Sequence, residues 1–224
     1  AYQTAYMKAH YPSEYMAALM TRRFSDIGEI TKLMEECQKM KISTLGPDVN
    51  ESYIEFGVNK KGEIRFGLSA IKGMGGAAAK AIVDEHKDIY DFVERVNTNA
   101  VNRKAMECLA ISGAFDGFGI DREVYLAPCN DRATFMEVLM RYGANVQQEK
   151  TEAQNSLFDD VGGIEVPRPL PPASYDKWSN IKRLEKEREL VGIYISGHPL
   201  DPYAVIMEQL CNTPFSKLSN LSLI

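Results

Sequence analysis

The residues best suited to chemistry in this sequence lie in a glycine-rich stretch, residues 68–83. Three glycines, Gly73, Gly75 and Gly76, separate two segments whose apolar residues recur at helical spacing, which predicts a short helix, a tight turn and a second helix. The first N–H groups of a helix lack intrahelical partners and the helix dipole is positive there, so such a turn offers a site for an anion. The alternative is a plain corner in which the glycines only permit the bend.

The order of hydrophobic and glycine residues in this stretch resembles the helix-hairpin-helix motif, which binds nucleic-acid phosphates without reading the base sequence. The resemblance rests on Ile71, Gly73, Met74, Gly75, Ala79 and Ile82. At Gly76 and Ala77 many members of this motif family have Pro and Lys, so one expected phosphate partner is missing here. Lys72 and Lys80 are the candidates to replace it. The resemblance therefore predicts DNA contacts at Lys72, Gly73, Met74, Gly75, Gly76 and Lys80.

A second and weaker copy of the pattern follows at residues 111–115. An internal repeat supports the motif more strongly than one copy does, and helix-hairpin-helix motifs commonly pair into one compact unit. Phe115 stands where a second turn glycine is expected, so this copy is predicted to be mainly structural. Its candidate DNA contacts are Ser112 and Gly113.

The elements that position these turns are predicted to be mainly α-helical, with one small β-hairpin. Helical spacing or capping residues indicate helices within residues 1–23, 26–37, 89–96, 101–112, 122–126, 130–143, 177–195 and 202–210. Gly143 and Gly197 are expected to end the helices that precede them. Alternating residues 53–58 and 63–66, joined by Asn-Lys-Lys-Gly, predict the hairpin. The mixed charges of residues 183–189 predict a solvated helix face.

The helical pattern fails over residues 145–173, which are polar and then rich in Gly and Pro, and this composition predicts a flexible linker. Within it, Leu157 and Phe158 follow Gln154 closely. Burying each apolar side chain in a partner's pocket would contribute about 1.5–3 kcal/mol, and the amide of Gln154 would bond at the pocket rim. The equally weighted alternative is that both apolar residues fold back onto this chain's own core.

The composition limits the classes of function. The 224 residues carry a net charge of −5, which argues against binding nucleic acid through bulk positive charge. Between residues 57 and 104, however, the sequence has nine Lys and Arg residues and six Asp and Glu residues, so this region carries a local excess of positive charge. The four cysteines and three histidines show no metal-ligand spacing, and the sequence has no nucleophile elbow, phosphate loop or membrane-spanning run. We therefore expect no catalytic site and no metal site in this chain.

Several long segments resemble the alpha subunits of bacterial DNA polymerase III, the family C replicative polymerases. AYQTAYMKAHYPSEYMAALM resembles the rear of their fingers region, and FGLSAIKGMGG and NRKAMECLAISGAFDGFG resemble their paired helix-hairpin-helix motifs. QNSLF resembles their sliding-clamp-binding peptide, and EKERELVGIYISGHPLDPY resembles the segment before an oligonucleotide-binding domain. The resemblance implies four regions: rear fingers helices (1–50), a β-hairpin with a tandem helix-hairpin-helix DNA-binding domain (51–144), the flexible linker with the clamp peptide (145–173), and helices leading to a missing domain (174–224).

The same resemblance implies a role. The paired motifs would hold duplex DNA behind a polymerase active site, and Gln154, Leu157 and Phe158 would dock on the sliding clamp (the beta subunit), beside other replicase subunits in the cytoplasm. The palm aspartates and the Mg²⁺ of such an enzyme would lie outside this chain, which starts without Met and is expected to be an inactive fragment with no cofactor of its own. Two alternatives stay open: a stand-alone DNA-repair adaptor, and a protein-interaction module that does not bind DNA.

Overall fold

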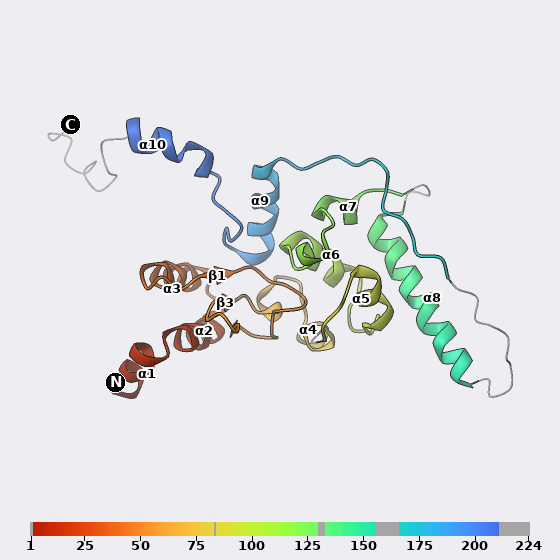
Figure 1. Ribbon diagram of the computed structural model, residues 1–224, viewed down its shortest axis with the longest axis horizontal. Helices are drawn as coiled ribbons and strands as arrows, with labels where there is room; N and C mark the ends of the chain where they lie inside the picture. The colour runs from red at the N-terminus through yellow and green to blue at the C-terminus, as the bar shows by residue number, and fades with distance from the viewer. Residues whose placement is uncertain (1, 83, 130–132, 156–165, 211–224) are drawn as a thin grey trace.

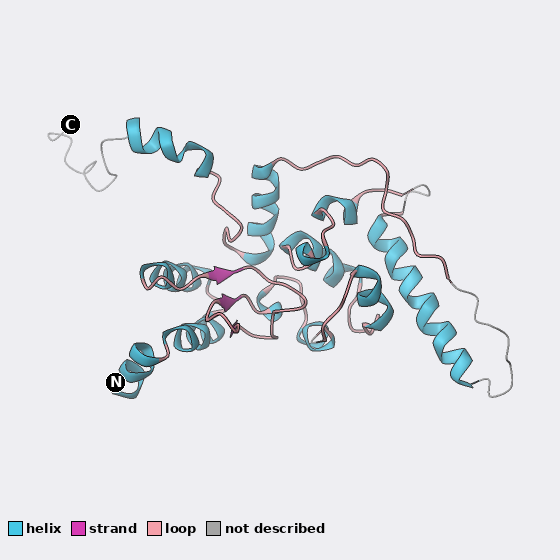
Figure 2. Ribbon diagram, viewed as in Figure 1, coloured by secondary structure: helices cyan, strands magenta, loops and turns pink. Residues whose placement is uncertain are grey.

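The computed structural model describes residues 2–82, 84–129, 133–155 and 166–210, and most of these are helical (Figures 1 and 2). The α-helices are α1 (Tyr2–His10), α2 (Pro12–Arg23), α3 (Ile27–Lys39), α4 (Gly76–Ala81), α5 (Ile89–Arg95), α6 (Arg103–Ser112), α7 (Arg122–Leu126), α8 (Phe135–Asn155), α9 (Asn180–Val191) and α10 (Ala204–Leu210). Short 3₁₀ helices are η1 (Leu68–Ala70), η2 (Asp116–Phe118) and η3 (Asp201–Tyr203). The prediction of a mainly helical chain is confirmed. Over the described ranges, none of the helices has the length and apolar character needed to cross a membrane.

Three short strands form one small sheet. In sheet order they are β1 (Thr44–Leu45), β3 (Ile64–Arg65) and β2 (Gly57–Val58). β2 and β3 form the predicted antiparallel hairpin, with Val58 opposite Ile64. β1 pairs with the other side of β3 in parallel, with Thr44 opposite Ile64. β1 was not among the predicted strands, because its partner β3 lies later in the chain, beyond the hairpin turn.

The first hydrophobic cluster joins α2 and α3 to the sheet. Its buried residues are Met16, Ala17, Met20, Ile30, Cys37, Phe56, Ile64, Phe66, Val191 and Ile193. Asp26 caps the start of α3, because its carboxylate accepts the N–H of Glu29 at 3.1 Å. Val191 is the last residue of α9 and Ile193 follows just beyond it, so this later part of the chain packs back onto the N-terminal helices.

The second hydrophobic cluster contains both predicted hairpin motifs and is built mainly from α4 to α8. Phe92 and Phe115 lie at its centre, fully buried, with ring centroids 5.1 Å apart. Asp88 and Asn102 cap α5 and α6, each accepting an N–H three residues further on, at 2.7 and 3.0 Å. The two motifs therefore share one core.

α8 corrects the prediction that Gly143 ends a helix, because the helix continues through this residue. The glycine permits a close approach of two helices instead: a Cβ there would overlap the carbonyl oxygen of Val93 in α5. One turn later, the amide of Gln147 donates to the carbonyls of Val93 and Val96, at 3.0 and 2.8 Å. α8 thus satisfies the last carbonyl groups of α5, and residues 145–155 of the predicted linker are helical.

α9 is shorter than the helix predicted for residues 177–195. Ser179 caps its start by accepting the N–H of Lys182 at 3.3 Å. Gly192, with φ +89°, ends it, so Gly197 is not the residue that stops this helix. Ile181, which the helical spacing of apolar residues in this stretch predicts to face inward, is 50% exposed.

Residues 166–178 run in extended form along the second cluster (Figure 1). The hydroxyl of Tyr90 donates to the carbonyl of Pro169 at 2.7 Å, and the guanidinium of Arg168 lies 5.1 Å from the centre of the same ring. Further along, Tyr175 donates to Asp121, the residue before α7, at 2.9 Å. This part of the predicted linker is therefore held against α5 and α7.

His86 should make the stability of this fold depend on pH. Its ring is buried with its centroid 4.8 Å from that of Phe92, and neither ring nitrogen has a hydrogen-bond partner among the described residues. Burial, and then the charge of Arg95, lowers the pKa of His86. In the unfolded chain the His86 imidazole takes up a proton near pH 6.5, whereas in the folded protein it takes up this proton only at a lower pH. The free energy of unfolding should therefore fall as the pH drops below about 6.5, by up to about 1.4 kcal/mol per pH unit.

Urea unfolding at about pH 7.5 and about pH 5.5 measures this loss, because ordinary carboxylates titrate below this window. His86→Leu should remove most of the difference between the two pH values. An equal loss of stability in the wild type and the variant would show that another group is responsible.

Candidate nucleic-acid interface

The first hairpin, residues 68–82, has the predicted helix–turn–helix form, with the 3₁₀ helix η1 in place of the first helix. Gly73 makes the turn with φ +90°, a backbone conformation that favours glycine. A Cβ at this position would lie 3.0 Å from Sγ of Cys108 and 3.5 Å from Cε of Lys104. The first turn therefore packs directly against α6 of the second motif.

This turn presents backbone donors to solvent. Within the described part of the chain, the N–H groups of Gly75, Gly76 and Ala77 donate to no acceptor, and all three residues are exposed. A Cβ at Gly75 or Gly76 would meet no atom within 4 Å, so the space beside these donors is open. Adjacent free N–H groups at the start of a helix can bond the oxygens of a phosphate.

The opposite side of the first hairpin is anchored in the second hydrophobic cluster. Ile71, Met74, Ala79 and Ile82 are all buried. Met74 was a predicted DNA contact, but only 8% of its surface is exposed, so its side chain helps to fix the turn from inside.

Three exposed lysines belong to the elements that form this turn. Lys72 and Lys80, both predicted contacts, are exposed and form no ion pair with any described residue. Lys104 projects from α6 beside Gly73 and is also exposed, without an ion pair in the described ranges. It was not among the predicted contacts, because only the packing of α6 on the first turn brings it there. Lys104 supplies a cation close to the turn, where Ala77 lacks the lysine of the motif family.

Gly73→Ala should lower the free energy of unfolding by about 1–3 kcal/mol, because the left-handed φ strains any residue with a Cβ. Gly76→Ala is the matched control, since it makes the same change in helical backbone with open space around it. The control should be neutral or slightly stabilising. Urea unfolding measures the free energy of unfolding of both variants. Equal values would mean that the turn does not require glycine at residue 73.

The second hairpin differs from the first because the protein itself fills its turn. Gly113 has φ +88°, but a Cβ there would overlap the guanidinium of Arg122 and lie 3.0 Å from its Nε. Ser112 is buried and donates its hydroxyl to the carbonyl of Leu109 at 3.1 Å. Both residues predicted to contact DNA at this turn are thus engaged within the protein.

Arg122 belongs to a buried network of ion pairs that the sequence pattern did not predict. Its guanidinium donates to Asp116 from Nε at 2.9 Å and from Nη2 at 2.6 Å, and to Glu187 from Nη1 at 2.9 Å. Only 4% of the Arg122 side chain and 1% of the Glu187 side chain are exposed. The prediction that residues 183–189 form a solvated face is therefore wrong at Glu187. Its carboxylate is buried because Arg122 of the second hairpin pairs with it.

Similarity to known proteins extends over most of this chain. Residues 41–125 match a family described as "Helix-hairpin-helix motif". The chain is 32% identical over 209 residues to DNA polymerase III subunit alpha of Vibrio cholerae, which covers 91% of this chain and 17% of the relative. The same subunit of Escherichia coli K12 is 33% identical over 219 residues, covering 93% of this chain and 18% of the relative. That of Saccharopolyspora erythraea is 37% identical over 212 residues, covering 90% and 17%.

The chain is homologous to a segment of DNA polymerase III alpha subunits. The resemblance predicted from the sequence is confirmed, and the matched motif region contains both hairpin turns. The chain spans less than a fifth of the length of these alpha subunits.

The clamp-docking residues predicted from the alpha-subunit resemblance lie mostly outside the described residues. Leu157 and Phe158 fall within residues 156–165, which the structure does not describe. The backbone of Gln154 forms part of the last turn of α8.

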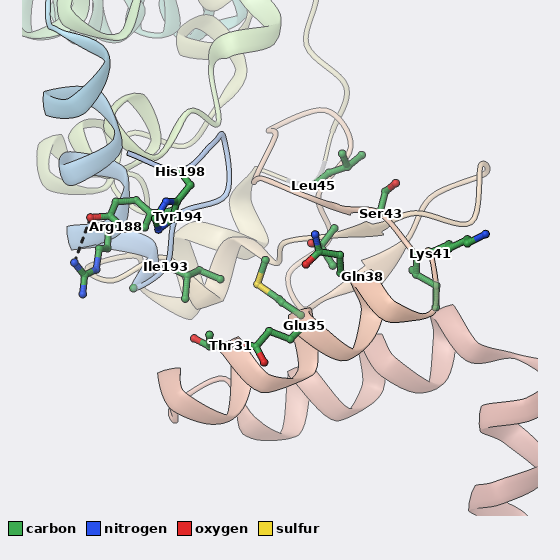
Figure 3. Close-up of a pocket in the computed structure, with 14 residues that line it drawn as sticks. Thr31, Glu35, Gln38, Lys41, Ser43, Leu45, Arg188, Ile193, Tyr194 and His198 are labelled. Carbon is green, nitrogen blue, oxygen red and sulfur yellow. Dashed lines mark hydrogen bonds between the residues drawn. The ribbon is translucent and has the colours of Figure 1, made fainter. Parts of the chain in front are cut away.

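A cleft of about 950 Å³ lies away from both hairpins, between α3 and the segment that follows α9 (Figure 3). Glu35 lines one side, and Arg188 and His198 line the other. The guanidinium of Arg188 lies 5.1 Å from the ring centre of Tyr194. The charges that line the cleft are mixed, and the described residues contain no group of three or more His, Cys, Asp or Glu side chains that could hold a metal ion.

Proposed function

We propose that this chain is the part of a replicative DNA polymerase that holds duplex DNA by its phosphates, without reading the base sequence, and that it performs no catalysis itself. The observation that carries this proposal is the first hairpin, which combines three unpartnered backbone donors on exposed residues with the exposed Lys72 and Lys80, and has Lys104 beside Gly73. The motif match and the polymerase names of the relatives support it.

Backbone donors suit binding that does not depend on sequence. Contacts to phosphates fix the position of a protein on the duplex, but they carry no direct information about the bases. Each lysine at the turn adds attraction to a phosphate and releases a counterion from the DNA. The net charge of −5 opposes long-range attraction, so the affinity should come from this local site. The second hairpin, whose turn Arg122 fills, would support the first.

A salt titration tests this proposal. The chain should bind two duplexes of unrelated sequence with the same affinity, and the logarithm of the binding constant should fall linearly with the logarithm of the salt concentration. Absence of binding at low salt, or a strong preference for one sequence, would contradict it. The acidic net charge favours one alternative, a protein-interaction module that does not bind DNA, and absence of binding is the result expected for that module.

We also propose that Gln154, Leu157 and Phe158 dock on a sliding clamp. Leu157 and Phe158 are large apolar residues in a polar stretch of sequence. Tethering to a ring on the DNA would raise the local concentration of the polymerase at the primer end. Leu157→Ala combined with Phe158→Ala should abolish capture by purified clamp and leave duplex binding unchanged. Clamp capture that survives both substitutions would place the contact elsewhere.

The remaining parts of the proposed replicase would come from other regions and subunits. An active site with its aspartates and Mg²⁺ would lie outside this chain, and the assembly would work in the cytoplasm. The chain alone should therefore extend no primer when it is given primed template, nucleotides and Mg²⁺, and measurable extension would contradict this assignment.

A further inference from the structure

α9 contacts both hairpins within a single helical turn. The carbonyl of Leu190 accepts the N–H of Lys72 at 2.9 Å, where the chain enters the first turn. Three residues earlier, Glu187 accepts a hydrogen bond from Arg122, whose guanidinium fills the second turn. α9 also packs against α6 (Figure 1). Because residues three apart in a helix have a fixed spacing, α9 connects the position of one turn to that of the other.

Glu187 also holds the chain that follows α9 against the helix. Its carboxylate accepts the N–H groups of Ile195 and Ser196, at 2.9 and 2.8 Å, and the hydroxyl of Ser196. Gly192, in the left-handed region, permits the chain reversal between them. Burial raises the pKa of the Glu187 carboxyl, but the hydrogen bonds from Ser196, Arg122 and Ile195 outweigh this effect and hold that pKa below its ordinary value.

The two hydrophobic clusters meet at the end of α9. Leu190 packs against both clusters, and Val191 and Ile193 are buried in the first. A shift of α9 would therefore move the Leu190 carbonyl relative to the first turn. Glu187 opposes such a shift, because its carboxylate is bonded both to Arg122 and to residues 195–196.

We propose that Glu187 is a positioning residue for DNA binding. By holding α9 against Arg122 and against residues 195–196, it keeps the Leu190 carbonyl where it fixes the backbone of Lys72 and the donors that follow. This inference rests on the proposed function of the first hairpin. It also gives a role to residues 180–196, which the DNA site itself does not use.

Positioning and simple electrostatics predict opposite effects when this charge is removed. DNA is a polyanion, so neutralising a carboxylate should by itself strengthen binding slightly. If Glu187 positions the first turn, Glu187→Gln should instead weaken binding about fivefold or more, which is the lower range for coupling between linked sites. Glu185→Gln is the matched control, because Glu185 is exposed on the same helix and loses the same charge.

The test measures the duplex-DNA affinity of the full chain and of both variants, together with hydrogen exchange of the Lys72 amide in the absence of DNA. In Glu187→Gln we expect weaker binding and an exchange rate of this amide raised about fivefold or more. Amides in α5 and α8 report any general loss of stability from the broken ion pair, so the exchange rate of the Lys72 amide should rise more than theirs. Glu185→Gln should leave the exchange rate of Lys72 unchanged.

Two results would overturn the inference: unchanged exchange of the Lys72 amide in Glu187→Gln, or an affinity that rises equally in both variants. If the wild-type chain itself binds no DNA, the proposed function fails. The exchange rates would still show, without DNA, whether Glu187 holds the first turn.

Discussion

Arg122→Met is expected to lower the free energy of unfolding by about 3–5 kcal/mol. The substitution leaves the carboxylate of Glu187 buried without its charged partner, and it removes the hydrogen bonds that Asp116 accepts from Nε and Nη2 of Arg122. A buried charge that loses its partner is strongly destabilising, because desolvation of the remaining ion is no longer compensated. Urea unfolding near neutral pH, followed by circular dichroism, measures the change.

A double variant, Arg122→Met with Glu187→Leu, separates the unpaired charge from lost packing. Replacing a whole buried ion pair with apolar residues is often neutral, so the double variant should be more stable than the single one. The recovery should be partial, since the N–H groups of Ile195 and Ser196 lose their acceptor. A loss below about 1 kcal/mol in Arg122→Met would contradict the importance of this buried pair.

Gly143→Ala should lower the free energy of unfolding by about 3 kcal/mol, at the upper end of the usual cost of overpacking. The new Cβ would overlap the carbonyl oxygen of Val93 and lie 2.9 Å from its carbonyl carbon. These are backbone atoms of α5, so α5 and α8 must move apart. That movement would weaken the bonds from Gln147 to α5 and the one from Tyr142 to Glu94.

The direction of this effect is informative, because helix propensity alone predicts the opposite. Gly→Ala in a helix interior gains about 1 kcal/mol when nothing obstructs the Cβ. Ala144→Gly, at the exposed neighbouring position, is the control and should cost about 1 kcal/mol. Thermal unfolding measures the stability of both variants. A stabilised Gly143→Ala protein would mean that α5 and α8 do not approach closely at this point.

The parts of this structure that sequence predicted correctly depend on local signals. The helices predicted within residues 26–37 and 101–112 form there, where Asp26 and Asn102 each bond an N–H only three residues away. Gly73 makes the first turn because its own φ requires glycine. Such features involve few residues close in the chain, so a sequence pattern contains all the information that they need.

The parts that sequence did not predict depend on partners far along the chain. Lys104 reaches the first turn only because α6 packs there. Glu187 is surrounded by charged and polar neighbours in sequence, and its burial follows from Arg122, which lies 65 residues earlier. Gly143 has the sequence signature of a helix end, and only the approach of Val93 explains why the helix continues.

The most direct test of the DNA site compares two triple lysine variants in salt titrations with duplex DNA. The first replaces Lys72, Lys80 and Lys104 with Ala. The control replaces Lys39, Lys60 and Lys61, which are exposed and change the net charge equally. Each phosphate contact contributes about −0.9 to the slope of log binding constant against log salt. The first variant should lose about two to three units of slope and most of its affinity, whereas the control should keep the wild-type slope. Equal slopes in the two variants would contradict a phosphate site at the first hairpin.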